Sequence, residues 1–415
     1  MCVWIGFRTR VSTRNRTRSL YNQLSCIAGL LTISAGVFTI QEGGSASIMS
    51  YDLESNEETL GTVPDLAAIK RNSSHIAPST SSVDEAVTRA SVSVIIPTYT
   101  MDRWDYLCEC IASAQAQTVQ TQEIIVVVDH NPELYARAMR ELSGVIVVPN
   151  ISRQGVSGAR NSGVKASCGE LIAFLDDDIV ASPDWLASLL RHFENPEVAG
   201  AGCHSEGLWE SPRPAWFPGE FGWTIGLSYS GMPNTPTAVR NVWTSAMVVK
   251  RTSFEMVDGF REDFGKVGNR NLPEDTDLCL RITSAHDKTI WIYDPSTVML
   301  HRVPAGRTTF GYLLSRCFLQ GWGKAAMASM DGFSTSTSME RDYTRRILPA
   351  GIGRGFAETI RGDIFGAVRS VSIIVALAFT MAGYLWYLLE SRRAMHAMGS
   401  ARGSRSMKKW WLPRA

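Results

Sequence analysis

Apolar residues in the middle of this chain come in short runs that end at polar groups. The runs cover residues 92–97, 123–129, 145–148 and 171–175. Continuous apolar runs of this length are typical of strands that are buried on both faces of a sheet. Because helical patterns separate them, the sequence predicts a mostly parallel α/β sheet flanked by helices.

The stretches between these runs carry helix signals. Apolar residues recur at helical spacing at Leu107, Ile111 and Ala114. The glycine-containing stretch 155–163 opens a helix before the fourth run, and residues 272–281 begin another. We expect Ser182 to cap a further helix, with Pro183 in its first position.

The second half of the pattern is less regular. Residues 244–249, 290–293 and 298–301 predict three more strands. Between them, residues 200–239 combine Pro and Gly with large aromatic side chains, and we expect this segment to be rich in loops. Its aromatic residues either line a binding site or simply pack against the rest of the protein. They are Trp209, Trp216, Phe217, Phe221 and Trp223.

Residues 1–90 differ from the rest and predict an N-terminal extension. A basic run precedes an apolar stretch at 26–40 and then small residues, which resembles a signal peptide. A second interpretation is that Met49 is the true start of the protein. Residues 52–90 are acidic and then rich in Ser and Thr, which is typical of a mostly disordered lead-in.

The C-terminal part contains a long uncharged stretch. Residues 370–390 predict a transmembrane helix, since about 20 apolar residues suffice to span a bilayer. Tyr384, Trp386 and Tyr387 suit the membrane interface. A buried or surface-lying hydrophobic helix is the alternative. We expect residues 326–369 to form a helical connector, and the basic tail 391–415 to contact anionic lipid.

Composition narrows the class of protein only slightly. The 415 residues are 45% hydrophobic and 20% charged, which is ordinary for a globular protein with extensions. A net charge of +1 neither favours nor excludes nucleic acid, and we expect no such partner. The 8 cysteines show no C-x-x-C spacing, which fits a reducing, cytosolic setting without a zinc site.

Three adjacent carboxylates, Asp176, Asp177 and Asp178, follow the strand at 171–175. In an open α/β sheet the carboxyl ends of the strands meet at a ligand crevice. Clustered carboxylates suit Mn²⁺ or Mg²⁺, ions that commonly hold substrate phosphates, although an acidic turn is the simpler alternative. Asp129 can accept hydrogen bonds from a base or ribose, or merely occupy a turn. Arg160 near a helix start can meet phosphate, or be a solvated helix residue.

Four motifs in this order resemble family 2 glycosyltransferases, which have the GT-A fold with a Rossmann-like nucleotide half. They are Val94-Ile95-Ile96-Pro97-Thr98-Tyr99, Gly158-Ala159-Arg160-Asn161-Ser162-Gly163, Phe174-Leu175-Asp176-Asp177-Asp178 and Glu274-Asp275-Thr276-Asp277-Leu278-Cys279-Leu280-Arg281. The similarity spans about residues 92–324 and predicts a glycosyltransferase domain at 91–325. Further phrases at 99–104, 128–133, 213–218 and 301–304 are similar to the glucosyl-dolichyl-phosphate glucuronosyltransferase group.

The resemblance implies roles for matching residues. The nucleotide would contact Pro97, Thr98, Tyr99, Asp129, Arg160, Asp176 and Asp177. The metal ligands would be Asp178, Asp176 and His301. The catalytic base would be Asp275, paired with Glu274. We expect the dipole of the helix that begins there to keep Asp275 ionised.

These features together predict a membrane-associated inverting glycosyltransferase. It would move a hexosyl or glucuronosyl group from a UDP- or GDP-sugar to a lipid-linked or polysaccharide acceptor, as in cell-envelope polysaccharide synthesis. The catalytic domain would face the cytoplasm, where nucleotide sugars are made. A sugar-1-phosphate nucleotidyltransferase and a non-catalytic sugar-binding protein on the same scaffold are the alternatives.

Overall fold

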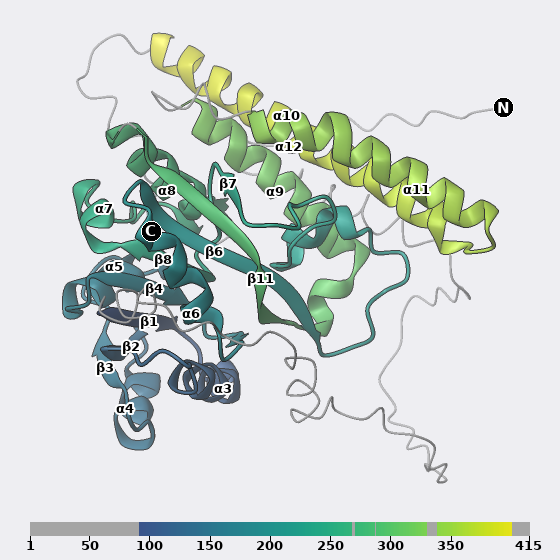
Figure 1. The fold of residues 1–415 in the computed structure, drawn as a ribbon. Coiled ribbons are helices and arrows are strands. Elements are labelled where there is room, and N and C mark those ends of the chain that lie inside the picture. Colours follow the sequence, from purple (N-terminus) through teal and green to yellow (C-terminus); the bar gives the residue numbers. More distant parts are fainter. Residues whose placement is uncertain (1–90, 268–269, 287, 330–337, 401–415) are drawn as a thin grey trace, which may run out of the picture. The chain divides into compact units, whose positions relative to one another are not determined.

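The computed structural model describes residues 91–267, 270–286, 288–329 and 338–400 (Figure 1). The expectations for residues 1–90 and for the tail beyond residue 400 lie outside these ranges.

The first half of the sheet is parallel, as the apolar runs predict. Its strands lie in the order β3 (Ile146–Pro149), β2 (Glu123–Val128), β1 (Val92–Thr98) and β4 (Leu171–Leu175). Successive residues of β1 face opposite layers, because side chains alternate along a strand. Val94 and Ile96 pack on one side and Ile95 on the other, so the strand is buried on both faces.

Helices cover both faces of this half. The face of Val94 carries α3 (Trp104–Gln115), α4 (Pro132–Glu141) and α6 (Trp185–Leu190). The opposite face carries α5 (Val156–Ala166), α7 (Arg251–Met256) and α8 (Glu274–Ala285). Gly163 lets α5 lie close to the sheet, since a Cβ there would be 2.4 Å from Ile95 Cγ2. The two layers fix the strand ends from which the site is built.

The second half of the sheet is mixed rather than mostly parallel. It continues from β4 through β8 (Ala246–Lys250), β6 (Val198–Trp209), β11 (Ile290–Val303) and β5 (Ile179–Ala181), and β7 (Thr237–Val239) also pairs with β11. Only β6 and β11 of these pair in parallel. A separate hairpin joins β9 (Gly265–Val267) to β10 (Arg270–Leu272).

Three local expectations were wrong. Part of the segment expected to be loop is β6, which is 12 residues long and rich in glycine that local pattern reading treats as a breaker. The two strands expected at 290–293 and 298–301 are one strand, β11, with a register shift between Asp294 and Val298. Ser182 does not cap α6, because the helix begins at Trp185 and the Ser182 hydroxyl bonds Thr297 Oγ1 at 2.9 Å.

Short helical turns connect these elements. They are η2 (Met101–Arg103), η3 (Arg191–Glu194), η4 (Gly219–Ile225), η5 (Ala305–Thr308) and the π-helical turn η6 (Tyr343–Ile347).

The C-terminal part forms a helical layer. It consists of α9 (Phe310–Ala328), α10 (Ser338–Asp342), α11 (Leu348–Ile360) and α12 (Phe365–Ser400). In Figure 1, α12 lies along α9 and α11. Glycines allow close contact: a Cβ at Gly383 would be 1.9 Å from Phe318 O on α9, and one at Gly355 would be 2.5 Å from Gly366 O. Within the described residues, the stretch Phe365–Arg393 is long and apolar enough to cross a membrane.

The close contact between α9 and α12 predicts that two Gly→Ala substitutions have opposite effects on the free energy of unfolding. Gly383→Ala should lower the free energy of unfolding by about 1–3 kcal/mol, because the added methyl group would meet the backbone of Phe318. Gly353→Ala, with no atom within 4 Å of its Cβ, should be stabilising by about 0.5–1 kcal/mol. Urea unfolding of both variants checks this, and equal stabilisation would contradict the packing.

Candidate active site

Three strand ends form one polar edge, as the sequence predicts. Thr98 ends β1, Asp129 follows β2, and Asp176 to Asp178 follow β4, and these strands are neighbours in the order β2, β1, β4. Thr98 Oγ1 donates a hydrogen bond to Asp177 Oδ2 at 2.9 Å, and the Asp129 amide donates to Thr98 O at 2.8 Å. Parallel pairing therefore brings residues 79 positions apart in the chain into direct contact.

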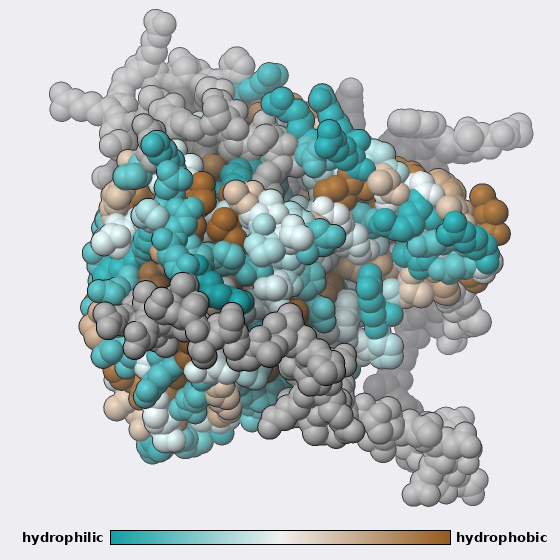
Figure 2. Space-filling model, in the orientation of Figure 1, coloured by the Kyte–Doolittle hydropathy of each residue, from teal (hydrophilic) through white to brown (hydrophobic). Residues whose placement is uncertain are grey.

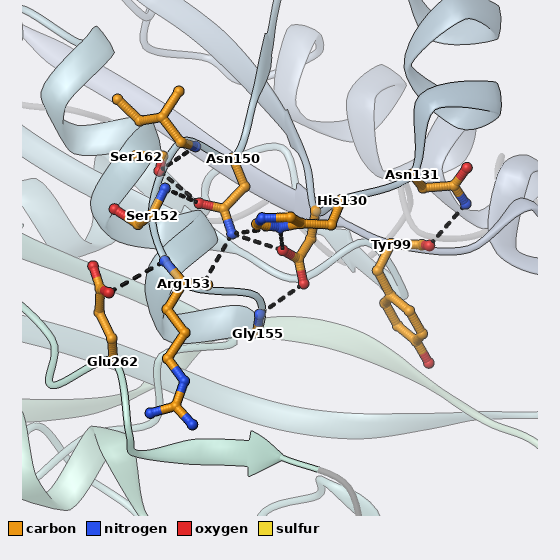
Figure 3. A network of polar contacts seen from close by, with 11 residues as sticks. Tyr99, His130, Asn131, Asn150, Ser152, Arg153, Gly155, Ser162 and Glu262 are labelled. Carbon is orange, nitrogen blue, oxygen red and sulfur yellow. Dashed lines mark hydrogen bonds and ion pairs between the residues drawn. The ribbon is translucent and has the colours of Figure 1, made fainter. Parts of the chain in front are cut away.

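Asp129 organises the loop before α5 (Figure 3). One carboxylate oxygen accepts hydrogen bonds from Asn150 Nδ2 at 2.6 Å and contacts His130 Nδ1 at 2.9 Å. The other accepts from the Gly155 amide at 2.9 Å. Asn150 Oδ1 in turn accepts a bond from Ser162 Oγ on α5 at 2.7 Å. Asp129 is thus more than a turn residue, because it ties the end of β2 to the start of α5.

The three residues expected beside Asp129 in a nucleoside pocket differ in accessibility. Pro97 lies within the buried strand β1, and Thr98 is 2% exposed with its hydroxyl already bonded to Asp177. Tyr99 is 53% exposed, and its carbonyl accepts a hydrogen bond from Asn131 Nδ2 at 3.1 Å. Tyr99 is therefore the accessible residue at this edge, with the Arg103 guanidinium carbon 5.7 Å from the centroid of its ring. Pro97 and Thr98 are buried beneath the surface of this edge.

Arg160 is a buried bridge between two carboxylates. Its side chain is 2% exposed, with Nη2 at 2.6 Å from Asp176 Oδ1 and Nη1 at 3.1 Å from Glu274 Oε1. The Phe260 ring lies 5.6 Å from the guanidinium carbon. Arg160 is therefore neither a solvated helix residue nor an open phosphate contact in this structure. It joins the aspartate cluster to the start of α8.

Asp177 is turned inward, away from solvent. Besides Thr98, it accepts a hydrogen bond from Arg103 Nη1 at 2.8 Å, and its side chain is 4% exposed. Burial raises the pKa of Asp177 to about 6, although Arg103 opposes the shift. Asp177 thus anchors the cluster to β1 and η2. Arg103 was missed as a site residue, although it lies within the phrase 99–104 that carries the family resemblance.

Asp178 and His301 face each other. His301 Nε2 lies 3.5 Å from Asp178 Oδ1, and both side chains are less than a tenth exposed. Burial alone would raise the pKa of Asp178, but the hydrogen bond and charge of His301 and the charges of Arg103 and Arg307 hold it well below its ordinary value. His301 packs against Gly226, where a Cβ would come within 2.3 Å of the ring.

This pair fits a divalent cation. A carboxylate with an imidazole is a donor set that Mn²⁺ accepts, and His301 turns its Nε2 towards Asp178 Oδ1, so both atoms could bind one cation. Asp176, the third expected ligand, is not with them, because its carboxylate is held by Arg160. Among the described residues no three His, Cys, Asp or Glu side chains gather to hold a metal, so further ligands would come from substrate or water.

Glu274 and Asp275 occupy the first turn of α8. Asp275 Oδ1 accepts a hydrogen bond from the Thr276 amide at 2.6 Å. Burial raises the pKa of Glu274 and of Asp275, against the opposing charge of Arg160. The dipole of α8, which we expect to favour the ionised form of Asp275, therefore acts against a loss of hydration that raises the pKa of this carboxyl. A raised pKa suits a group that accepts a proton during reaction.

Asp277 has a structural role on the same helix. Its side chain is fully buried and pairs with Arg281 at 2.8 Å and Arg261 at 3.5 Å. It therefore differs from its neighbour Asp275, which is partly exposed.

Fold and site define the class of the protein. Residues 93–257 match the family model described as Glycosyl transferase family 2. The mixed sheet between two helical layers, with carboxylates at the strand ends, is GT-A-like. The chain belongs to glycosyl transferase family 2, and the protein is a glycosyltransferase, as the motifs predict.

The chain is also similar to individual proteins and to a solved structure. The glucosyl-dolichyl phosphate glucuronosyltransferase of Haloferax volcanii is 31% identical over 304 residues, covering 72% of this chain and 96% of that protein. The succinoglycan biosynthesis protein ExoM of Rhizobium meliloti is 27% identical, covering 63% and 92%. Among solved structures, the mannosyltransferase PcManGT from Pyrobaculum calidifontis, in complex with GDP-Man and Mn²⁺, is 19% identical with a TM-score of 0.48, covering 72% and 88%.

The buried bridge predicts a large stability loss in Arg160→Met. The substitution leaves Asp176 and Glu274 without their shared cation, and breaking a buried ion pair costs about 3–5 kcal/mol. The matched control is Arg346→Met, because Arg346 is 82% exposed and pairs with Asp342 at 3.2 Å. Such exposed i,i+4 pairs contribute about 0.3–0.5 kcal/mol. Similar unfolding midpoints for the two variants would show that Arg160 does not hold the site together.

Proposed function

We propose that this glycosyltransferase moves a hexosyl or glucuronosyl group from a UDP- or GDP-sugar to a lipid-linked or polysaccharide acceptor hydroxyl, with inversion at the anomeric carbon. The observation that carries the proposal is the Arg160 bridge, because it sets the carboxylates after β4 and those at the start of α8 on either side of one guanidinium. The carboxylates after β4 would hold the cation that neutralises the leaving diphosphate, and those at the start of α8 would receive the proton of the attacking hydroxyl.

The diphosphate side consists of Asp178 and His301, with Arg103 and Arg307 close by. Asp178 and His301 would hold Mn²⁺ or Mg²⁺, which when bound stabilises the charge that develops on the leaving diphosphate. Arg103 and Arg307 lie 3.2 and 3.8 Å from Asp178 Oδ2, so they add positive charge at the same place. Tyr99 and the edge organised by Asp129 would receive the nucleoside.

The acceptor side consists of Asp275 and Glu274. Asp275 accepts the proton of the acceptor hydroxyl as the oxygen attacks the sugar, and the nucleoside diphosphate leaves from the opposite face. Because the hydroxyl attacks one face of the anomeric carbon while the diphosphate leaves from the other, the anomeric centre is inverted, as in inverting glycosidases that use a carboxylate base. Glu274 stays paired with Arg160 and keeps the first turn of α8 aligned with the aspartate cluster.

The lipid-linked acceptor is supported by the Haloferax volcanii relative, whose name is glucosyl-dolichyl phosphate glucuronosyltransferase. An acceptor of that chemistry resides in a membrane, and the apolar α12 supplies a means of association. We place the catalytic domain on the cytoplasmic side, where nucleotide sugars are made. Family membership favours sugar transfer over the nucleotidyltransferase and binding-protein alternatives.

Metal dependence provides one test. Isothermal titration should show that UDP binds more tightly with Mn²⁺ than in EDTA, and that Asp178→Asn or His301→Ala removes this gain, because each deletes one donor. His286→Ala is the matched control, since His286 is an exposed histidine beyond the end of α8. Equal UDP affinity in Mn²⁺ and in EDTA would contradict the proposed metal site.

The base role of Asp275 provides a second test. Asp275→Asn should bind UDP normally and transfer sugar about 10²–10⁴-fold more slowly, the usual contribution of a general base. In the unmodified enzyme transfer should fall as the pH drops through the raised pKa of Asp275, because the protonated carboxyl cannot accept a proton. That acid limb should be absent from the variant.

The control for this test is Asp184→Asn rather than Asp277→Asn. Asp184 precedes α6, is exposed and makes no capping hydrogen bond, whereas removal of the charge of the buried Asp277 carboxylate would disturb its ion pairs with Arg261 and Arg281. Asp184→Asn should transfer sugar at the normal rate. Normal turnover in Asp275→Asn would move the base role to Glu274 or end the displacement mechanism.

A further inference from the structure

We propose that α12 lies in the plane of an anionic membrane surface and docks there through one apolar face, rather than crossing the bilayer. The inference rests on the proposed function in so far as a lipid-linked acceptor brings the enzyme to a membrane. It is carried by the packing of α12, by the distribution of its exposed side chains and by the charges at its ends.

The first argument is that α12 is bound to α9 along much of its length. Gly383 contacts the backbone of Phe318, and Gly321 contacts that of Thr380. Farther along, Trp322 Nε1 donates a hydrogen bond to Glu390 Oε2 at 3.2 Å. The two helices therefore run side by side in the same direction, and α12 cannot enter a bilayer without α9.

The second argument is that α9 belongs to the catalytic domain. Its Leu313 and Cys317 are buried in a cluster with Val303 of β11 and Phe217, and its Met327 packs against Phe264.

Charge also keeps α9 out of hydrocarbon. Lys324 on α9 forms an ion pair with Glu340, and Arg240 binds the same carboxylate at 2.8 Å. Charged groups at the centre of a bilayer are costly. A spanning α12 would pull this network towards hydrocarbon, whereas an in-plane α12 leaves it in water.

The third argument is the apolar face that α12 leaves open. Large hydrophobic side chains that are 41–53% exposed recur at every third residue from Phe365 to Ile374. They recur at every fourth residue from Met381 to Leu389. This stripe consists of Phe365, Val368, Val371, Ile374, Met381, Leu385 and Leu389. From Val371 to Leu389 the spacing keeps these side chains on one helical face, which is the pattern of helices that lie in a membrane interface, whereas Phe365 and Val368 lie farther round the helix at its start.

The tip of the hairpin between α11 and α12 extends the stripe. Phe356, Ile360 and Ile364 are 49%, 88% and 72% exposed. Figure 2 shows hydrophobic surface at this tip, on the right of the view, beside hydrophilic surface. Single exposed apolar residues are common on soluble proteins, but a continuous row of this length marks an interaction surface.

Charge complementarity identifies the occupant as an anionic lipid surface. Exposed arginines bracket the stripe, with Arg361 before it and Arg392 and Arg393 directly after it. A cavity of about 280 Å³ lies beside the second turn of α12, and Arg213 in its lining can meet a lipid phosphate, while Arg369 there is paired with Glu358 and Asp363. Basic residues around an apolar helical face favour anionic headgroups, whereas an apolar protein partner would not need them.

The first experiment measures vesicle binding of the full chain by flotation. Binding should be at least tenfold stronger to phosphatidylglycerol vesicles than to phosphatidylcholine vesicles and should weaken in high salt. Ile374→Asp/Leu385→Asp should bind at least tenfold less. The matched control is Met139→Asp/Met256→Asp, which changes two equally exposed apolar residues elsewhere and should bind normally. Equal binding by the stripe variant and the control would overturn the docking surface.

The second experiment distinguishes an in-plane helix from a spanning one. Arg361→Cys and Arg393→Cys are labelled with a membrane-impermeant maleimide on sealed vesicles, and mass spectrometry locates the label. An in-plane α12 gives label at both ends from the same side, and label at only one end would establish a spanning helix and overturn the proposal.

Failure of the proposed function is distinguishable from failure of this inference. UDP binding by the stripe variant is measured in solution and should be unchanged. Loss of vesicle binding with intact UDP binding supports the docking surface, whatever acceptor the enzyme uses. An enzyme that docks normally but transfers no sugar to any lipid-linked acceptor contradicts the acceptor proposal alone.

Discussion

One buried guanidinium holds the two halves of the site together. Arg160 has almost no contact with solvent, so its charge is compensated only by the carboxylates of Asp176 and Glu274. A buried charge is tolerated only when it is paired. The ion pairs of Arg160 therefore help to fix the position of α8 relative to β4. Because Asp275 lies at the start of α8, they also fix the position of Asp275.

Cationic side chains surround the three aspartates after β4. Asp176 pairs with Arg160, Asp177 pairs with Arg103, and Asp178 faces His301 with Arg103 and Arg307 also close by. Three adjacent carboxylates would otherwise repel one another in a region of low hydration. Asp177 is buried and faces inward, so it anchors the cluster. Asp178 lies beside the imidazole of His301, where it is suited to bind a cation.

The C-terminal helices pack on one another and, through α9, on the catalytic domain. Glycines at the crossings allow α12 to lie against α9 and α11 at backbone distance, because a side chain at those positions would collide with a carbonyl. Close contact between helices requires small residues at the interface. The same packing leaves the bulky residues of α12 on its outer face, so the sequence composition that suggests a membrane span also fits a surface helix.

The sequence by itself determined the parallel half of the sheet, the strand-end carboxylates and the family, because those depend on local runs and short motifs. It did not determine the strand β6, the continuity of β11 or the partners of Arg160, which depend on contacts between distant segments. Arg160 and Glu274 are 114 positions apart, and only the packing of α5 and α8 on one sheet face brings them together. The raised pKa of Asp275 likewise follows from burial, which tertiary structure alone decides.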